Sequence, residues 1–340
     1  MARIERAAAV RPAFAIDGRP VAGPDEDGFT LAVAAVERLP ALPVGPHPLP
    51  VDLVGEFPEV IEAGLPAALG RPVALHRHEE RAAGLAEAVA DANDRADLGE
   101  RSLVLAVDLP ERSDDPAPGE GALAIALAIG PGDGLLRSPA GGDSPLRAAE
   151  AALELRTADP APDPGRWIGA WDRPAAPGRP IDAAALREAA GASVHGVSEG
   201  AYVPRPRYLE ELPSRWRLVA ERCGVCGAAT FPGRGVCVRC GRRDALSGEL
   251  LPRDGGTVVA STVVGRGGQP TEFDRSVEAL GPYGVVLVEL APGVRGTFQV
   301  ADAPALPLAI GDRVGTRLRR LYPLEGEWRY GRKAVPLGGG

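Results

Sequence analysis

The chain has 340 residues, of which 45% are hydrophobic and 25% charged, and its formal net charge is −8. This length and composition predict two or three globular domains with apolar cores of their own. The acidic balance argues against wholesale electrostatic attraction to nucleic acid or anionic lipid, although a local basic patch could still bind phosphate.

Nothing in the sequence predicts a membrane-spanning or secretory segment. No run approaches the roughly 18 consecutive apolar residues that a membrane helix needs. The stretch Met1–Val10 carries the acidic Glu5 and lacks the apolar region of a signal peptide. We therefore expect a cytoplasmic protein with no membrane partner.

Residues 1–135 are predicted to form an α/β domain, because Ala-rich helical segments alternate with short apolar runs that suit buried strands. The first helix is expected at Asp25–Leu39, where three acidic residues favour the N-terminus and Pro40 ends the helix. Its apolar residues should fall on one side. A second helix is expected at Glu79–Asn93, and apolar strand-like runs follow at Ser102–Asp108 and Gly121–Ile129.

Residues 136–200 are predicted to be a connector, because they are rich in Pro, Gly and Asp and resist regular structure. Two islands inside this connector, Ser144–Arg156 and Ile181–Ala190, have the Ala, Leu and Glu content of short helices. Neither segment contains a recognisable catalytic or binding motif.

Residues 201–246 contain all four cysteines of the chain, after a segment with Tyr208 and Trp216 that we expect to dock on the cysteine-bearing ribbon. The spacing is Cys-x2-Cys, ten residues, then Cys-x2-Cys, and a glycine follows each pair. Such loops supply four thiolates in tetrahedral geometry, and the glycines allow the tight turns beneath the sulfurs. The predicted ligands are Cys223, Cys226, Cys237 and Cys240.

Zinc is the predicted metal, in preference to iron, and its role should be structural because four thiolates leave no open coordination position. The alternatives are buried free cysteines or two disulfides. Two matched pairs in a reducing compartment fit those alternatives poorly.

The segment around the cysteines is basic although the whole chain is acidic. Between residues 201 and 245 there are nine arginines and four acidic residues, so 9 − 4 = +5. Four thiolates and one divalent ion would reduce this to about +3. The basic patch could bind a ligand phosphate or an acidic partner, or it could be a solvated face paired with the acidic remainder. The candidate ligand- or partner-binding residues are Arg222, Arg234, Arg242 and Arg243.

Residues 247–340 are predicted to be all-β, with strands at Gly256–Val264, Gly284–Leu290, Gly296–Val300 and Val314–Leu321. Short strands of this number and spacing suit an OB-type barrel. A zinc ribbon beside such a barrel could also bind single-stranded nucleic acid by stacking bases on its aromatic rings. That function is the alternative hypothesis, although the acidic balance counts against it.

His76, His78, Glu79 and Glu80 form a further polar cluster that could bind a metal or act in acid/base chemistry. Polar residues before an Ala-rich helix more often form its solvated first turn, so we favour the structural interpretation.

The motifs from Tyr202 to Asp312 resemble a known family that combines a rubredoxin-like zinc ribbon with an OB-fold and accompanies thiolases and related acyl-CoA enzymes. This resemblance implies a noncatalytic protein that bridges acyl-CoA enzymes or helps to hold a CoA-linked intermediate. The residues that carry it are Tyr202, Pro204, Arg207–Leu209, Glu221–Cys223, Phe231–Pro232, Arg234, Cys237, Gly256–Val258, Pro282–Leu290, Gly293–Arg295 and Ile310–Asp312.

The N-terminal region resembles part of a thiolase-fold enzyme of the hydroxymethylglutaryl-CoA synthase type, through Asp25–Asp27, Thr30–Ala35 and Gly119–Ala122. By this resemblance, Arg81 or a close neighbour stands where the catalytic cysteine should be. Acyl transfer in that superfamily needs a thiolate, and no cysteine exists outside residues 223–240.

The sequence therefore predicts a multidomain α/β plus all-β protein: a partial thiolase-like domain, a connector, a zinc ribbon and an OB-fold. The predicted function is that of a noncatalytic accessory or scaffold subunit, with a thiolase-like or hydroxymethylglutaryl-CoA synthase-like enzyme as partner and acyl-CoA as a possible ligand. An enzyme that acts on acyl-CoA without a cysteine is a third hypothesis, but nothing in the sequence assembles such a site.

Overall fold

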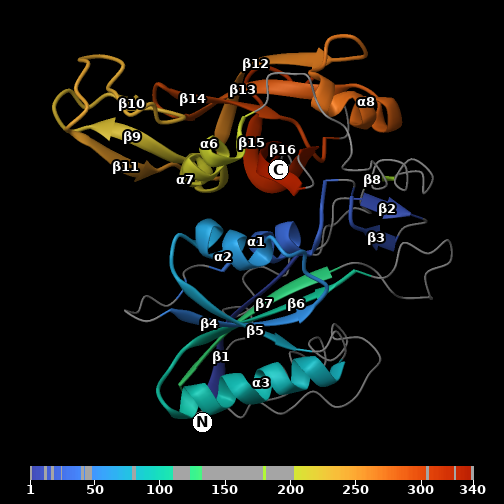
Figure 1. Cartoon of the computed structure of the whole chain (residues 1–340). Coiled ribbons are helices and arrows are strands. Elements are labelled where there is room, and N and C mark those ends of the chain that lie inside the picture. The colour runs from blue at the N-terminus through green and yellow to red at the C-terminus, as the bar shows by residue number, and fades with distance from the viewer. Residues whose placement is uncertain are drawn as a thin grey trace. The chain divides into compact units, whose positions relative to one another are not determined.

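The computed structural model places the chain in two compact units, one built mainly from residues 1–181 and the other mainly from 182–340 (Figure 1). The residues that the structure describes are 2–10, 14–16, 19–23, 25–39, 42, 48–78, 82–109, 123–131, 179–180, 203–303, 306–324 and 327–337. The two helices expected in the connector lie outside this set.

The first unit is centred on a five-stranded mixed sheet. Its strands in spatial order are β1 (Ala2–Val10), β7 (Leu123–Pro131), β6 (Ser102–Asp108), β4 (Leu49–Gly55) and β5 (Val73–His78). β4 runs parallel to β5 and β6, whereas β7 is antiparallel to β6 and β1. The predicted strand Ser102–Asp108 is confirmed, and the next strand begins two residues later than the predicted run.

Helices cover both faces of this sheet, with α1 (Gly28–Glu37) and α2 (Ile61–Leu69) on one side and α3 (Ala82–Asp97) on the other (Figure 1). Burial on both faces explains why β6 and β7 read as nearly continuous apolar runs. The helix predicted at Glu79–Asn93 corresponds to α3, which continues to Asp97. A small sheet joins β2 (Phe14–Ile16) to β3 (Arg19–Val21) and β8 (Arg179–Pro180).

Helix α1 begins later than predicted because Asp27 is its N-cap. The Asp27 carboxylate accepts a hydrogen bond from the Thr30 N–H, and the Thr30 hydroxyl accepts one from the Asp27 N–H, both at 2.9 Å. Every residue from Gly28 to Val36 is buried, so burial extends beyond the side on which Phe29, Val33 and Val36 lie. The helix is buried all round, with the Phe29 ring packed against Gly64 of α2.

The described part of the second unit starts at residue 203 with two short helices, α6 (Arg205–Glu210) and α7 (Leu212–Arg217), which lead into a three-stranded antiparallel sheet. In this sheet the central β9 (Val219–Cys223) pairs with β10 (Ala229–Thr230) and β11 (Leu246–Leu250). We call residues 219–250 the ribbon.

A five-stranded antiparallel sheet follows, with the spatial order β14-β13-β12-β15-β16. The one-residue alternation of burial along β13 shows that one face of this sheet is covered. An isolated bridge between Val300 and Ala334 joins the two edges, but the described residues form no ladder that would close a barrel. The elements are β12 (Gly256–Val264), η2 (Thr271–Phe273), α8 (Asp274–Leu280), β13 (Tyr283–Ala291), β14 (Val294–Gln299), β15 (Arg313–Leu324) and β16 (Glu327–Pro336).

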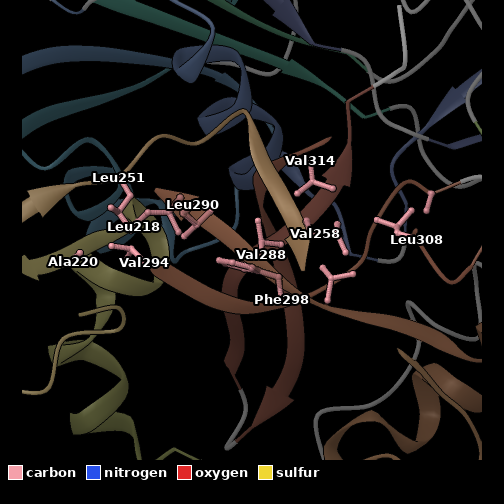
Figure 2. Close-up of a cluster of buried hydrophobic side chains, with 13 residues drawn as sticks. Leu218, Ala220, Leu251, Val258, Val288, Leu290, Val294, Phe298, Leu308 and Val314 are labelled. Atoms are coloured by element: carbon pink, nitrogen blue, oxygen red, sulfur yellow. The ribbon is translucent and has the colours of Figure 1, made fainter. Parts of the chain in front are cut away.

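The ribbon and the five-stranded sheet share one hydrophobic core (Figure 2). Leu218 and Ala220 enter it from the start of the ribbon, and Leu251 enters directly after β11. They pack in one cluster with Val258, Val286, Val288, Leu290, Val294, Phe298, Ala303, Leu308, Val314 and Ala334. The ribbon is therefore packed as part of this unit and does not form a separate domain.

The aromatic segment before the ribbon docks chiefly on β16. The Tyr208 hydroxyl donates to the Tyr330 carbonyl at 3.0 Å and accepts from the Tyr330 N–H at 2.8 Å, while Trp216 Nε1 donates to the same carbonyl at 3.0 Å. The expectation that this segment docks on the ribbon was therefore incomplete, although α7 also contacts β9. None of the described helices is long and apolar enough to cross a membrane.

Candidate metal centre

Two loops of the ribbon with matching backbone geometry carry the four cysteines. In each loop the glycine after the second cysteine donates its N–H to the carbonyl of the first, from Gly227 to Cys223 and from Gly241 to Cys237, both at 2.9 Å. The two glycines have φ angles of +71° and +75°, which residues with a Cβ rarely adopt. The role predicted for the two glycines is confirmed.

The four sulfurs lie close enough together to share one metal ion. Cys223 Sγ is 3.7 Å from Cys240 Sγ, and Cys226 Sγ is 3.5 Å from Cys237 Sγ. All four sulfurs lie within 4.8 Å of one another. Because a disulfide requires about 2.05 Å, these cysteines are free thiols. Sulfurs placed tetrahedrally at about 2.3 Å from one ion would be about 3.8 Å apart, so the donor set fits a metal ion.

Backbone N–H groups of the loops favour the thiolate form that metal binding requires. Hydrogen bonds from the N–H groups of Cys240 and Arg239 lower the pKa of Cys237 to about 6. The equivalent N–H groups in the first loop, those of Cys226 and Val225, lower the pKa of Cys223. The loop backbone thus stabilises negative charge on Cys223 and Cys237, whereas the neighbouring cysteines raise the pKa of Cys240 to about 12.

Two of the four arginines predicted to bind a ligand or partner already have carboxylate partners. Arg222 forms a bidentate pair with Glu249 at 2.6 and 2.9 Å and also donates to the Gly227 carbonyl at 2.7 Å. Arg242 forms a bidentate pair with Asp244 at 2.9 and 3.0 Å. The bond to Gly227 spans the first loop, and the two carboxylate pairs leave both arginines less available to another anion.

The other two, Arg234 and Arg243, are exposed, and so is Arg239, which was not among the candidates. No hydrogen bond or ion pair involves these three guanidinium groups within the described residues. Each loop also exposes a valine between its cysteines, Val225 at 61% and Val238 at 59%. We call these five residues the knuckle surface. It combines unneutralised positive charge with exposed apolar side chains.

The structure also brings together a polar site that the sequence did not reveal. His78 does not begin a helix but ends strand β5, and its largely buried Nε2 lies 3.0 Å from Oδ1 of the fully buried Asp52. A charged residue within the apolar strand Leu49–Gly55 was the signal in the sequence that could have indicated this contact. Glu79, Glu80 and the position of Arg81 lie outside the described residues.

A comparison with curated proteins decides the family. A DUF35 domain-containing scaffold protein from Methanothermobacter thermautotrophicus is 32% identical to this chain over 121 residues, which is 85% of that protein and 36% of this chain. The chain belongs to the DUF35 scaffold protein family. A second DUF35 domain-containing scaffold protein, from Methanocaldococcus jannaschii, is 29% identical over 133 residues, or 89% of its length and 38% of this chain.

Solved structures show more distant similarity to this DUF35 protein, and no family model matches it. A chain described as Ltp2-ChsH2(DUF35) aldolase is 21% identical, with 40% of this chain and 98% of that chain covered and a TM-score of 0.30. PksG, a hydroxymethylglutaryl-CoA synthase from Bacillus subtilis, is 18% identical with a TM-score of 0.31. That match covers 38% of this chain and only 41% of the synthase. TM-scores this low do not establish a shared overall fold.

Proposed function

We propose that this DUF35 protein is a noncatalytic scaffold subunit of a thiolase or hydroxymethylglutaryl-CoA synthase-type enzyme complex in the cytoplasm. The observation that carries the proposal is the match along 85% of a DUF35 domain-containing scaffold protein. The thiolase context comes from the sequence motifs in both halves of the chain. The lack of any cysteine outside residues 223–240 supports a noncatalytic role, because the thiolate chemistry of such enzymes has no nucleophile here.

The metal in this proposal is zinc, held by the four cysteines. Zinc suits a tetrahedral set of four thiolates, and such a closed site leaves no position for substrate or water. The ion would therefore hold the two loops folded and would take no part in a reaction. The N-terminal unit is proposed to be a partial thiolase-like domain, and the five-stranded sheet to be an OB-fold variant.

The knuckle surface is the proposed contact for the partner enzyme, an acyl-CoA phosphate, or both. Arg234, Arg239 and Arg243 have no carboxylate partner among the described residues, so they can bind an external anion without breaking an internal ion pair. The exposed Val225 and Val238 add apolar area beside this charge. An acidic protein surface with apolar side chains satisfies both features, whereas a phosphate satisfies only the first.

The alternative function, binding of single-stranded nucleic acid, needs rings that are free to stack on bases. In the five-stranded sheet the Phe273 ring packs instead against Tyr283 and Tyr322, at centroid distances of 5.6 and 5.4 Å. The Trp328 ring is covered by the Arg320 guanidinium at 4.6 Å. These internal contacts favour the scaffold function over nucleic-acid binding.

The test is affinity purification of the tagged chain from its native host, with mass spectrometry of co-eluting proteins and of bound CoA esters. The wild-type chain should retain a thiolase- or synthase-type enzyme in stoichiometric amount. The triple variant with Arg234→Glu, Arg239→Glu and Arg243→Glu should retain on the order of tenfold less, because like charges now oppose an acidic partner.

A control is Arg266→Glu, which reverses one exposed charge outside the ribbon, that of an arginine paired with Glu278 at 3.1 Å. It should retain the partner as the wild type does, and metal content should be equal in all three proteins. Recovery of nucleic acid instead of an enzyme would favour the alternative function. A triple variant that retains both enzyme and CoA ester in full would remove the knuckle surface from the proposal.

A further inference from the structure

The first unit contains a buried charge that belongs to no part of the scaffold proposal. Asp52 lies in the middle of β4 and is fully buried. Its Oδ1 is 3.0 Å from His78 Nε2, and its Oδ2 is bound by Arg95 of α3. Burial still raises the pKa of Asp52 above its ordinary value, although His78 and Arg95 oppose this effect. The buried carboxylate is thus held between one guanidinium and one imidazole.

Helix α3 presents three charged residues to the same place, each four residues from the next. Asp91 Oδ2 lies 4.0 Å from His78 Nε2, and Glu87 Oε2 lies 3.9 Å from His78 Nδ1. With Asp52, Glu87 and Asp91 ionised, Arg95 protonated and His78 neutral, the formal charge is −3 + 1 = −2. A divalent cation would neutralise this cluster, whereas protonation of His78 would supply only one positive charge.

We propose that Asp52, His78 and Asp91 form a binding site for a divalent metal ion. One donor atom from each of the three residues lies within 4.8 Å of the other two. Donors bound at about 2.1 Å to one ion stand about 3.0–3.4 Å apart, so the Asp52 and His78 atoms are already in place. Asp91 has to move by about an ångström, and its side chain is 54% exposed and free to do so.

The neighbouring groups suit this role for His78. To bind an ion through Nε2, the imidazole must carry its proton on Nδ1, which faces the Glu87 carboxylate. Arg95 holds the other oxygen of Asp52 and so leaves Oδ1 for the metal. One imidazole and two carboxylates, with water from the exposed side, form a donor set that accepts Mn²⁺ as well as zinc. This site is independent of the scaffold proposal.

The test uses the full chain loaded with one equivalent of zinc, which the four cysteines hold, and freed of excess zinc so that the proposed site is empty. Mn²⁺ is added, and the free ion is followed by its electron paramagnetic resonance signal, because Mn²⁺ prefers oxygen and nitrogen donors and does not compete for thiolates. The wild type should bind one equivalent of Mn²⁺. Asp91→Asn should weaken binding by about tenfold or more, and His78→Gln should weaken it further.

The control is Asp94→Asn, which removes an exposed carboxylate from the same helix outside the cluster and should bind Mn²⁺ as the wild type does. Circular dichroism melts check that each variant is folded. If His78→Gln does not fold, the Mn²⁺ affinity of Asp91→Asn alone tests the proposal, because the Asp91 side chain is half-exposed. No stoichiometric Mn²⁺ in the wild type, or equal affinity in wild type and Asp91→Asn, would overturn the proposal.

Discussion

Removal of the metal from the four-cysteine site should unfold the second unit rather than loosen only the two loops. Structural zinc sites contribute roughly 10–16 kcal/mol of binding free energy, whereas a whole domain is stable by about 5–15 kcal/mol. The ribbon cannot unfold independently, because Ala220 within it and Leu218 and Leu251 at its two ends are part of the same core as Val258 and Val288. The loss of the ion is therefore comparable to the entire stability of the unit.

Differential scanning calorimetry of zinc-loaded and chelator-treated protein, with metal content measured on the same samples, tests this prediction. The transition of the second unit should disappear on metal removal and return when one equivalent of zinc is added under reducing conditions. The first unit contains none of the four cysteines, so its transition should persist after chelation, apart from any stabilisation by the divalent ion proposed at Asp52, His78 and Asp91. An unchanged thermogram at zero metal content would refute the reasoning.

Two substitutions in the second unit have matched controls. Gly227→Ala forces a Cβ onto a residue with a φ of +71°, which costs about 1–2 kcal/mol, so zinc affinity measured by chelator competition should fall about tenfold. The control Gly224→Ala should have no effect, because Gly224 has an ordinary φ and the nearest atom to an added Cβ is 3.6 Å away. Tyr208→Phe leaves the buried Tyr330 N–H without its acceptor, so the free energy of unfolding measured in urea should fall by about 1–3 kcal/mol. The control Tyr322→Phe removes a hydroxyl with no hydrogen bond among the described residues and should lower the free energy of unfolding by less. Burial also raises the pKa of Tyr208 to about 12, so the folded state resists ionisation while the unfolded chain ionises near pH 10. Stability should fall as the pH rises from about 10 to 12, by about 1.4 kcal/mol at pH 11, and Tyr208→Phe should lack this part of the loss.

The clustering of the four cysteines could be predicted from the sequence because its information is local. Two Cys-x2-Cys pairs and the glycines that follow them specify both loops, and each loop closes with a hydrogen bond between residues four apart. The cap of α1 is equally local, because Asp27 and Thr30 are three residues apart, although the prediction began this helix at Asp25. Short-range constraints of this kind need no knowledge of the tertiary fold.

Features that depend on distant pairing were missed or misplaced. Asp52 and His78 are 26 residues apart and meet only because β4 and β5 are neighbours in a parallel sheet. Strand β16 was not predicted because Arg329 and Arg332 are buried, at 2% and 6% exposure, and this breaks the apolar–polar alternation that indicates a strand. Tyr208 was expected on the ribbon because the ribbon follows it in sequence, whereas its hydroxyl pairs with a residue 122 positions away.

In the proposed scaffold role the second unit acts through its surface, and a metal ion bound by the four cysteines would hold that surface in shape. Four thiolates would leave such an ion no open position, so its contribution would be to the shape of the loops. Those loops expose Val225 and Val238, and they are attached through β9 to a core that also contains β13 and β14. A contact surface anchored in this way is held in place before a partner arrives, so binding does not have to supply the free energy of ordering it. A closed metal site beneath exposed charged and apolar side chains is therefore what a scaffold requires, and it is the opposite of what a metal-dependent catalyst requires.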